Sequence, residues 1–281
     1  MKFTRKSLIA AASAAIFPAA ASAEAIMQIN SSLPAGSFAH VFLLEYETRL
    51  EAAAPGEIDV QIFMSNTLGK EEDVLQGLGF GTHQASLSAS AVSQINTRTS
   101  IFDLPYLFED RAAVQTFIGS PAGEMLADGF DGTGMVLAAM WDNGFRQITN
   151  NVRPIVTPAD LDGLKIRTPT NRQRVEMFNT LGANATPLSF GEVYSALDQG
   201  TIDGQENPLW VLEVYKFYEI QKYMTLTRHV YSAHIDVASL AWWKTLDQPQ
   251  QEMIQQTMYE AAVYQRADNR AKDDARLRLL K

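Results

Sequence analysis

The sequence lacks several residue types and motifs on which common enzyme classes depend. None of the 281 residues is cysteine, which excludes disulfides, thiol nucleophiles and thiolate metal ligands. There is no G-x-S-x-G, no phosphate-binding loop and no G-x-G-x-x-G, and the four histidines do not form H-E-x-x-H. We therefore expect no catalytic residues, no bound metal and no cofactor, and we interpret the histidines as structural or surface residues.

Basic clusters and long apolar runs are also missing beyond the N-terminus. The formal charge of the chain is −9, and an acidic surface repels phosphate groups, so we expect no nucleic-acid partner. No run of about 18 apolar residues follows the first 23 residues. With 46% hydrophobic and 20% charged residues, the composition is typical of a soluble α/β protein of one large domain or two small ones.

Residues 1–23 have the pattern of a secretory signal peptide. The basic residues Lys2, Arg5 and Lys6 precede an Ala-rich apolar run, and Ala21-Ser22-Ala23 is a small-x-small cleavage site. The alternative, an N-terminal membrane anchor, is disfavoured because the apolar run is short and interrupted. We predict cleavage after Ala23, which takes the formal charge of the exported chain from −9 to −12.

Strand-like and helix-like patterns alternate along the chain and open as a βαβ unit. The patterns predict strands at 26–30, 58–63, 84–88 and 135–141, and helices at about 37–54 and 70–78. Asp142-Asn143-Gly144 has turn chemistry and precedes another alternating strand, so we predict a turn and a crossover between two domains here.

Two further helical features follow. Ser189-Phe190-Gly191-Glu192 matches the S-x-x-E capping box and predicts a helix start. A helical pattern from about 248 to 280 would span about 50 Å, which is long enough to cross two domains and brace them.

Polar side chains stand at the ends of two predicted strands. In GLKIRTPTN, Thr168-Pro169 turns the chain away after Arg167, whose planar fork of donors suits a carboxylate. The alternative for Arg167, and equally for Arg146, is an ion pair with an acidic side chain. In TIDGQENPL, Asn207 precedes a proline and exposes an amide as donor and acceptor. If they converge, two arginines and one amide would bind a carboxylate.

Four longer strings carry a resemblance to a known family: NGFRQITN, GLKIRTP, LGANATPLSFGEVYSALDQGTIDGQENPL and KFYEIQKYMTLTRHVY. Together they resemble the DctP family, the extracytoplasmic solute-binding proteins of tripartite ATP-independent periplasmic (TRAP) transporters. Weaker similarity extends over nearly the whole chain from Ala25.

The resemblance implies an α/β fold of the periplasmic-binding-protein type, a two-lobed clamshell with mixed sheets and a long bracing helix. The first lobe would comprise 24–143 plus about 233–265, and the second 144–232 plus about 266–281. Family members typically continue for a few dozen residues beyond the long helix. The resemblance therefore leaves two expectations, a truncated C-terminal end or a less well covered second lobe.

The resemblance also assigns candidate ligand-binding residues in the second lobe. The family's carboxylate-binding arginine falls on Arg167, the second arginine on Arg146, and the asparagine beside the ligand carboxylate on Asn207. Phe190 matches the aromatic wall of the pocket. Trp210 is a candidate for stacking on the ligand, with a core position as the alternative, and the same choice applies to Trp141.

In the first lobe, Asn30, Glu71 or Glu72, and Ser88 match positions where family members meet the distal part of the solute. Ser88 and Ala89 stand where sialic-acid binders carry an acidic residue, which argues against sialic acid as the ligand here.

By resemblance, the chain is a monomeric periplasmic binding protein. It would capture a small organic acid, a C4-type dicarboxylate or a sugar acid, and deliver it to the small and large membrane subunits of a TRAP permease. One alternative is a periplasmic sensory module that presents the acid to a receptor. The other is an exported enzyme using Asp142 or Glu206 as acid or base, which no nucleophile, metal set or cofactor loop supports.

Overall fold

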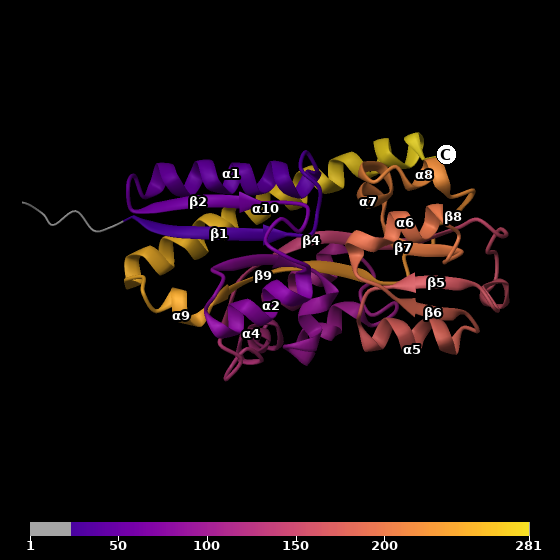
Figure 1. Ribbon diagram of the computed structural model, residues 1–281, viewed down its shortest axis with the longest axis horizontal. Coiled ribbons are helices and arrows are strands. Elements are labelled where there is room, and N and C mark those ends of the chain that lie inside the picture. The colour runs from indigo at the N-terminus through magenta and orange to yellow at the C-terminus, as the bar shows by residue number, and fades with distance from the viewer. Residues whose placement is uncertain (1–23, 281) are drawn as a thin grey trace, which may run out of the picture.

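The computed structural model describes residues 24–280, so the predicted signal peptide Met1–Ala23 lies outside the described residues. Figure 1 shows an elongated molecule with two lobes side by side. One nine-stranded sheet runs through both lobes in the order β2-β1-β3-β9-β4-β7-β5-β6, and β8 pairs with β4 away from this path. The two-lobed α/β architecture expected from the sequence is confirmed.

The first lobe contains the predicted βαβ opening. Its strands β1, β2 and β3 are parallel, with bounds Ala25–Ser31, Ile58–Phe63 and Ala85–Ser88. Its helices and 3-10 turns are α1 (Phe38–Ala53), α2 (Glu71–Phe80), η1 (Ser90–Gln94), η2 (Thr97–Asp103), α3 (Arg111–Ile118) and α4 (Pro121–Asp128). Ser37 caps α1 by accepting a hydrogen bond from the backbone N–H of His40.

The second lobe holds shorter elements. Its strands are β5 (Lys165–Thr168), β6 (Asn184–Pro187), β7 (Gly204–Pro208) and β8 (Tyr223–Thr225). Its helices and 3-10 turns are η3 (Pro158–Leu161), α5 (Arg172–Thr180), η4 (Phe190–Glu192), α6 (Val193–Asp198), α7 (Leu209–Val214) and α8 (Phe217–Ile220). Strand β5 is parallel to both β6 and β7, so Arg167 near its carboxyl end lies at the sheet edge where α/β proteins bind ligands.

Two long antiparallel strands join the lobes, β4 (Met135–Asn150) and β9 (Tyr231–Ser239). The predicted turn at Asp142-Asn143-Gly144 is wrong, because β4 continues through these residues with a shift in register between Asp142 and Gly144. A β-bulge and a tight turn both favour a glycine at positive φ, and Gly144 has φ of 114°. Strand β4 stays paired with β9 as far as Phe145, just past this bulge, and from Arg146 onward it pairs with β7.

The predicted long helix is confirmed as α10 (Gln248–Leu279), which follows the short α9 (Leu240–Trp243). It contacts α1 in the first lobe and α7 in the second, and Figure 1 shows it running along both. Its Gln265 exchanges hydrogen bonds with the backbone of Asp142, and its Asn269 donates to the Asp142 carboxylate at 2.6 Å. The bracing helix is therefore fastened to β4 at the bulge between the lobes.

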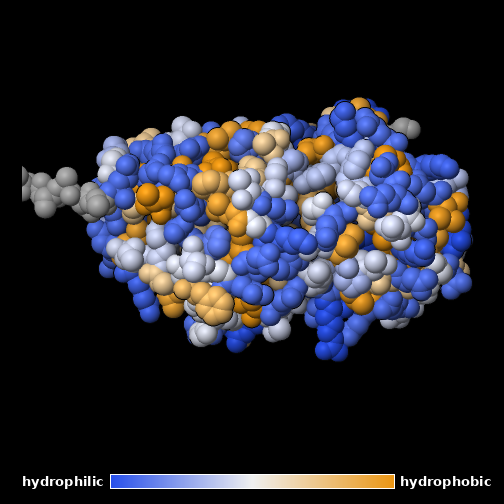
Figure 2. All heavy atoms as spheres, in the orientation of Figure 1, coloured by the Kyte–Doolittle hydropathy of each residue, from blue (hydrophilic) through white to orange (hydrophobic). Residues whose placement is uncertain are grey.

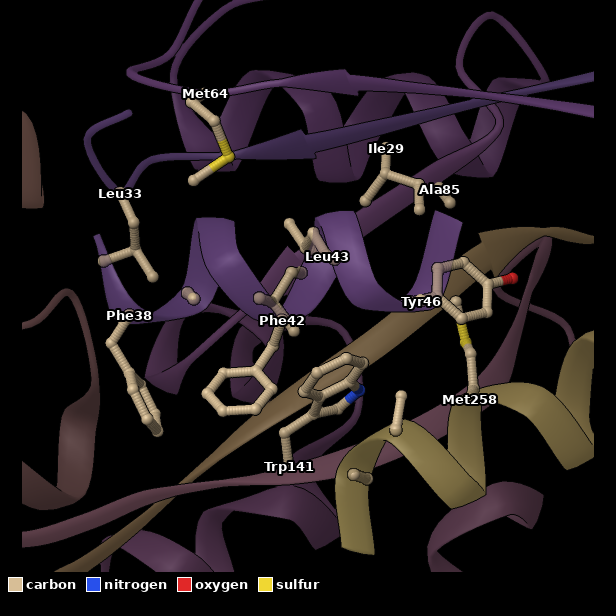
Figure 3. Close-up of a cluster of buried hydrophobic side chains, with 14 of the residues drawn as sticks. Ile29, Leu33, Phe38, Phe42, Leu43, Tyr46, Met64, Ala85, Trp141 and Met258 are labelled. Atoms are coloured by element: carbon tan, nitrogen blue, oxygen red, sulfur yellow. The ribbon is translucent and has the colours of Figure 1, made fainter. Parts of the chain in front are cut away.

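The largest apolar cluster lies between α1, the sheet and α10. Figure 3 shows Phe42 of α1 beside Trp141 of β4, and Tyr46 of α1 beside Met258 of α10. A second cluster covers the α2 side of the first lobe, and a third lies between β5 and α5. The outer surface in Figure 2 is mostly hydrophilic, with apolar groups scattered across it. Within residues 24–280, no helix has the length and apolar character needed to cross a membrane.

We expect Gly144→Ala to lower the free energy of unfolding by about 1 to 3 kcal/mol, because alanine is strained at this φ. The added Cβ would also lie 3.3 Å from Nη2 of Arg111. Gly119→Ala is the matched control, since Gly119 ends α3 with an ordinary φ of −81°. Urea unfolding of both variants measures the difference, and equal losses would contradict strain at the bulge.

Candidate functional site

A cavity of about 50 Å³ lies between the two lobes, with room for a few water-sized groups. It is bounded by the carboxyl ends of β3 and β5, the start of α2 and α7, and the bulge of β4. Six of the sequence-predicted residues line it together: Glu71, Arg146, Arg167, Phe190, Asn207 and Trp210.

Arg167 enters this cavity with its charge unbalanced. Its Nε and Nη2 both donate to the backbone oxygen of Leu188, at 2.9 and 2.6 Å, which fixes one edge of the guanidinium. The Nη1–Nη2 edge keeps its remaining N–H groups, and no acidic group among residues 24–280 lies within ion-pair distance. Burial and, to a lesser extent, the nearby Arg146 cation lower the pKa of Arg167 to about 9, and the group stays charged at neutral pH.

Arg146 is in a different state, because Glu206 neutralises it. Its Nε and Nη2 form a forked pair with the Glu206 carboxylate, and Nη2 also donates to the Glu206 backbone oxygen. The side chains of both residues are almost completely buried. Arg146 therefore forms the ion pair with an acidic side chain that was the alternative to carboxylate binding in the sequence analysis. The residue nevertheless also lines the cavity.

Glu206 is the centre of a larger buried network. It accepts from Nη1 of Arg174 at 2.7 and 2.9 Å and contacts Nε2 of His229 at 3.1 Å. Arg174 also pairs with Asp103 at 2.9 Å. Burial alone would raise the pKa of Glu206, but the two arginines hold it far below its usual range. Burial lowers the pKa of His229, so this ring is a neutral member of the network.

The first-lobe side of the cavity carries negative charge. Glu71 accepts from the backbone N–H of Ala89 at 2.9 Å, which holds its carboxylate at the cavity wall. Burial raises the pKa of Glu71, and the adjacent Glu72 raises it further. Both acids line the cavity, so an arginine and two carboxyl groups face the same small volume.

The remaining second-lobe residues form the aromatic and amide wall. Phe190 packs beside the Arg167 guanidinium, with the cation 5.6 Å from the ring centroid. Trp210 donates its indole N–H to the backbone oxygen of Asn143 at 2.8 Å. Asn207 donates its amide to Gln205 at 2.6 Å, which orients the amide oxygen. Trp141 lies in the core and not in the cavity wall.

Asn30 and Ser88 are not part of the cavity lining, although each lies close to it in β1 and β3. Both side chains are fully buried. The Ser88 hydroxyl contacts that of Ser86 at 3.2 Å, and neither amide atom of Asn30 has a hydrogen-bond partner within the described chain. Ser32, two positions after Asn30, and Leu87 and Ala89, on either side of Ser88, line the cavity instead.

Hydrogen bonds between the lobes close the cavity mouth. Glu72 of α2 accepts from the hydroxyls of Thr170 at 3.0 Å and Ser189 at 3.2 Å in the second lobe. The capping box predicted at Ser189 is therefore wrong, because this side chain bonds across the cleft and makes no cap hydrogen bond to η4. Gln94 and Thr170 form a further contact between the lobes, and the structure is that of a closed form.

The sequence analysis named Glu72 of the cavity wall as the alternative to Glu71, because two successive helix positions could not be told apart. It did not predict five other polar residues of the wall: Ser32, Ser90, Asn143, Thr170 and His234. Asn143 was read as part of a turn. His234 was read as structural, since a single histidine in a strand carries no motif. Alternation along β9 could have placed its side chain on a defined face, but not beside a cavity.

Within the described part of the chain, no group of three or more His, Cys, Asp or Glu side chains is arranged to hold a metal ion. What the cavity offers is a fixed guanidinium edge, an amide, aromatic walls and hydrogen-bond acceptors opposite. Fold and cavity together define a two-lobed protein that encloses a small anion.

Comparison with known families agrees with this class. The family model described as "Bacterial extracellular solute-binding protein, family 7" (DctP) matches residues 29–281. The chain belongs to this family, and the resemblance inferred from the sequence motifs is confirmed.

Two curated relatives illustrate the range of the family. The 2,3-diketo-L-gulonate-binding periplasmic protein YiaO of Escherichia coli is 34% identical, over 81% of this chain and 70% of its own. The C4-dicarboxylate-binding periplasmic protein DctP of Vibrio cholerae is also 34% identical, over 79% of this chain and 67% of its own.

Two solved structures have the same fold as this chain over most of its length. The sugar acid binding protein DctPAm of Advenella mimigardefordensis, in complex with galactonate, superposes with a TM-score of 0.88 at 31% identity, covering 92% of this chain and 83% of that one. A TRAP periplasmic solute-binding protein of Polaromonas, bound to D-erythronate, gives 0.86 at 31% identity, covering 92% and 86%. The chain is thus a solute-binding protein of the periplasmic TRAP class.

We expect Glu206→Gln to lower the free energy of unfolding by about 3 to 5 kcal/mol at pH 7, because two buried arginines lose their shared counter-charge. The low folded pKa of Glu206 makes its contribution fully present above the unfolded pKa of about 4.3 and lost as the pH falls below it. The gap between variant and wild type should therefore narrow below about pH 4.

Chemical unfolding at a series of pH values checks both parts of this prediction. Glu176→Gln is the control, since this carboxylate forms an exposed pair with Arg172 and should give no measurable change. A gap between Glu206→Gln and wild type that stays constant with pH would contradict the assigned ion pairs.

Proposed function

We propose that this protein captures a small hydroxylated monocarboxylate, of the sugar-acid kind, and delivers it to a TRAP permease. In this account the ligand carboxylate binds the Nη1–Nη2 edge of Arg167, and its hydroxyl groups face Glu71. The observation that carries the proposal is the buried guanidinium of Arg167, which has a fixed orientation and no acidic partner in residues 24–280.

Electrostatics favour a carboxylate at Arg167 over one at Arg146. A buried cation without a counter-charge is costly, and a ligand carboxylate would remove that cost at Arg167. Arg146 already shares a carboxylate with Arg174, so a second anion there would compete with Glu206. Two parallel hydrogen bonds to a planar fork would also orient the ligand.

The same electrostatics distinguish the two ligand classes considered from the sequence. A C4 dicarboxylate held at Arg167 would direct its second carboxylate toward the first lobe, where Glu71 and Glu72 line the cavity. Like charges at close range repel each other, whereas a hydroxyl can donate to Glu71. Relatives described as binding galactonate and D-erythronate are consistent with this preference, whereas DctP of Vibrio cholerae is described as binding C4-dicarboxylates, so the family includes both ligand classes.

Further parts of the proposal concern the whole chain. We propose that it is a binding protein without catalytic activity, that it acts as a monomer, and that it is cleaved after Ala23 on export. We propose lobe boundaries of 24–143 plus about 233–265 and of 144–232 plus about 266–281. The bulge of β4 and the path of α10 across both lobes support these boundaries.

Ligand-induced stabilisation tests the class of ligand. We expect hydroxylated monocarboxylates to raise the melting temperature of the chain from Glu24 onward, and neutral sugars and amino acids to leave it unchanged. A ligand at one hundred times its dissociation constant adds about 2.7 kcal/mol of stability. A response confined to neutral compounds would refute a carboxylate site.

Arg167→Ala should weaken binding of a responding acid by several kcal/mol, about 2 to 5, because the ligand carboxylate loses its charged partner. Arg167→Lys should also bind poorly, since a point charge cannot reproduce the fork. Asn207→Ala, which removes a neutral hydrogen bond, should cost only about 1 kcal/mol. Titration calorimetry measures all three, and wild-type affinity in Arg167→Lys would rule out a bidentate grip.

A further inference from the structure

His234 is a cavity residue whose hydrogen-bonding capacity is unused. It lies in β9 opposite Trp141 of β4, is only 5% exposed, and lines the cavity between Arg146 and Trp210. No hydrogen bond joins either ring nitrogen to another residue of the described chain, in contrast to His229, which bonds to Glu206. Neither ring nitrogen is among the fully buried atoms that lack a partner, so a water or a ligand group in the cavity can bond to them.

The ring is held in place by its surroundings. Trp210 meets it edge to face, with centroids 6.0 Å apart and an angle of 79°. Trp210 is itself fixed, because its indole N–H donates to the backbone oxygen of Asn143, and the Asn143 amide donates to Ser232 at 3.1 Å. The imidazole therefore lines the cavity from β9, in a position set by its contact with Trp210.

The charge state of the ring decides what it can bind. Burial and, to a lesser extent, the Arg146 cation lower the pKa of His234 to about 3. At neutral pH the imidazole is uncharged, with one nitrogen as donor and the other as acceptor. An alcohol satisfies both roles, because its oxygen accepts and its O–H donates. A carboxylate satisfies only the donor and would set a negative oxygen near the other lone pair.

We propose that His234 is a specificity-determining residue that binds a hydroxyl group of the ligand and thereby favours hydroxy acids over unsubstituted and dicarboxylic acids. This inference rests on the proposed function, since it takes the carboxylate to be held by Arg167. It adds a second point of recognition, on the strand pair between the lobes, that sequence motifs did not indicate.

The test compares acids of equal chain length that differ in hydroxylation. Titration calorimetry compares their affinities. The four-carbon acids are butyrate, 2-hydroxybutyrate, 3-hydroxybutyrate, D-erythronate and succinate. Hexanoate and galactonate form a six-carbon pair. Each acid is measured on wild type, His234→Phe and His234→Gln. Phenylalanine keeps the ring against Trp210 and removes both nitrogens, whereas glutamine keeps a donor and an acceptor.

We expect wild type to prefer the hydroxylated member of each pair. In His234→Phe the ratio of affinities should fall by about two- to ten-fold, the range of one neutral hydrogen bond. His234→Gln should retain part of the preference. His83→Phe, which alters a histidine outside the cavity lining, should leave the ratio unchanged.

Each outcome has a distinct meaning. If His234→Phe weakens hydroxylated and unsubstituted acids by the same factor, the residue only packs against Trp210 and the inference is overturned. The inference is also overturned if wild type prefers butyrate or succinate to D-erythronate. If no acid of either length binds wild type, the proposed function fails first, and it does so independently of any His234 variant.

Discussion

The charge on Arg167 is the constraint on which the rest of the site depends. A guanidinium buried between two lobes has to be balanced, and three arginines lie close together in this protein. Glu206 and Asp103 balance Arg146 and Arg174, whereas among residues 24–280 Arg167 donates only to the carbonyl oxygen of Leu188. Arg167 thus directs a positive charge without an ion-pair partner toward a small cavity, and in the proposed function a ligand carboxylate balances it.

The fold makes this arrangement possible by bringing distant segments to one place. Arg167 and Asn207 lie near the carboxyl ends of two parallel strands of the second lobe, and Glu71 begins a helix of the first. Strand β4 carries Arg146 just past its bulge. Helix α10 is fastened to the same bulge through Asp142 and spans both lobes. Closing the lobes excludes water, which strengthens the interaction between the arginine and a carboxylate. A ligand shifts the balance toward the closed form only by binding that form more tightly.

Much of the fold followed from local pattern. The alternating strands and the helical pattern at about 248–280 each depend on nearby residues, so the sequence could predict them. The turn prediction at Asp142-Asn143-Gly144 was wrong because a β-bulge and a turn favour the same residue types. Only the pairing with the neighbouring strand distinguishes them. The capping box predicted at Ser189 was wrong because the Ser189 hydroxyl instead donates to Glu72, more than one hundred residues away in the sequence.

The site was predictable in its residue types but not in its charge balance. Motif positions indicated Arg146 and Arg167 alike, yet one is neutralised and the other is not, and that difference arises from where Glu206 and Leu188 lie in space. His234 shows the same limit, because its unused nitrogens follow from the packing of Trp210 and Asn143 around it.

A crystal structure of the protein with its tightest-binding hydroxy acid tests the central claim most directly. The account predicts both carboxylate oxygens within about 2.7 to 3.2 Å of Nη1 and Nη2 of Arg167, with the Arg146–Glu206 pair intact and the hydroxyls toward Glu71. A carboxylate bound at Arg146 in place of Glu206, with Arg167 still joined only to Leu188, would contradict it.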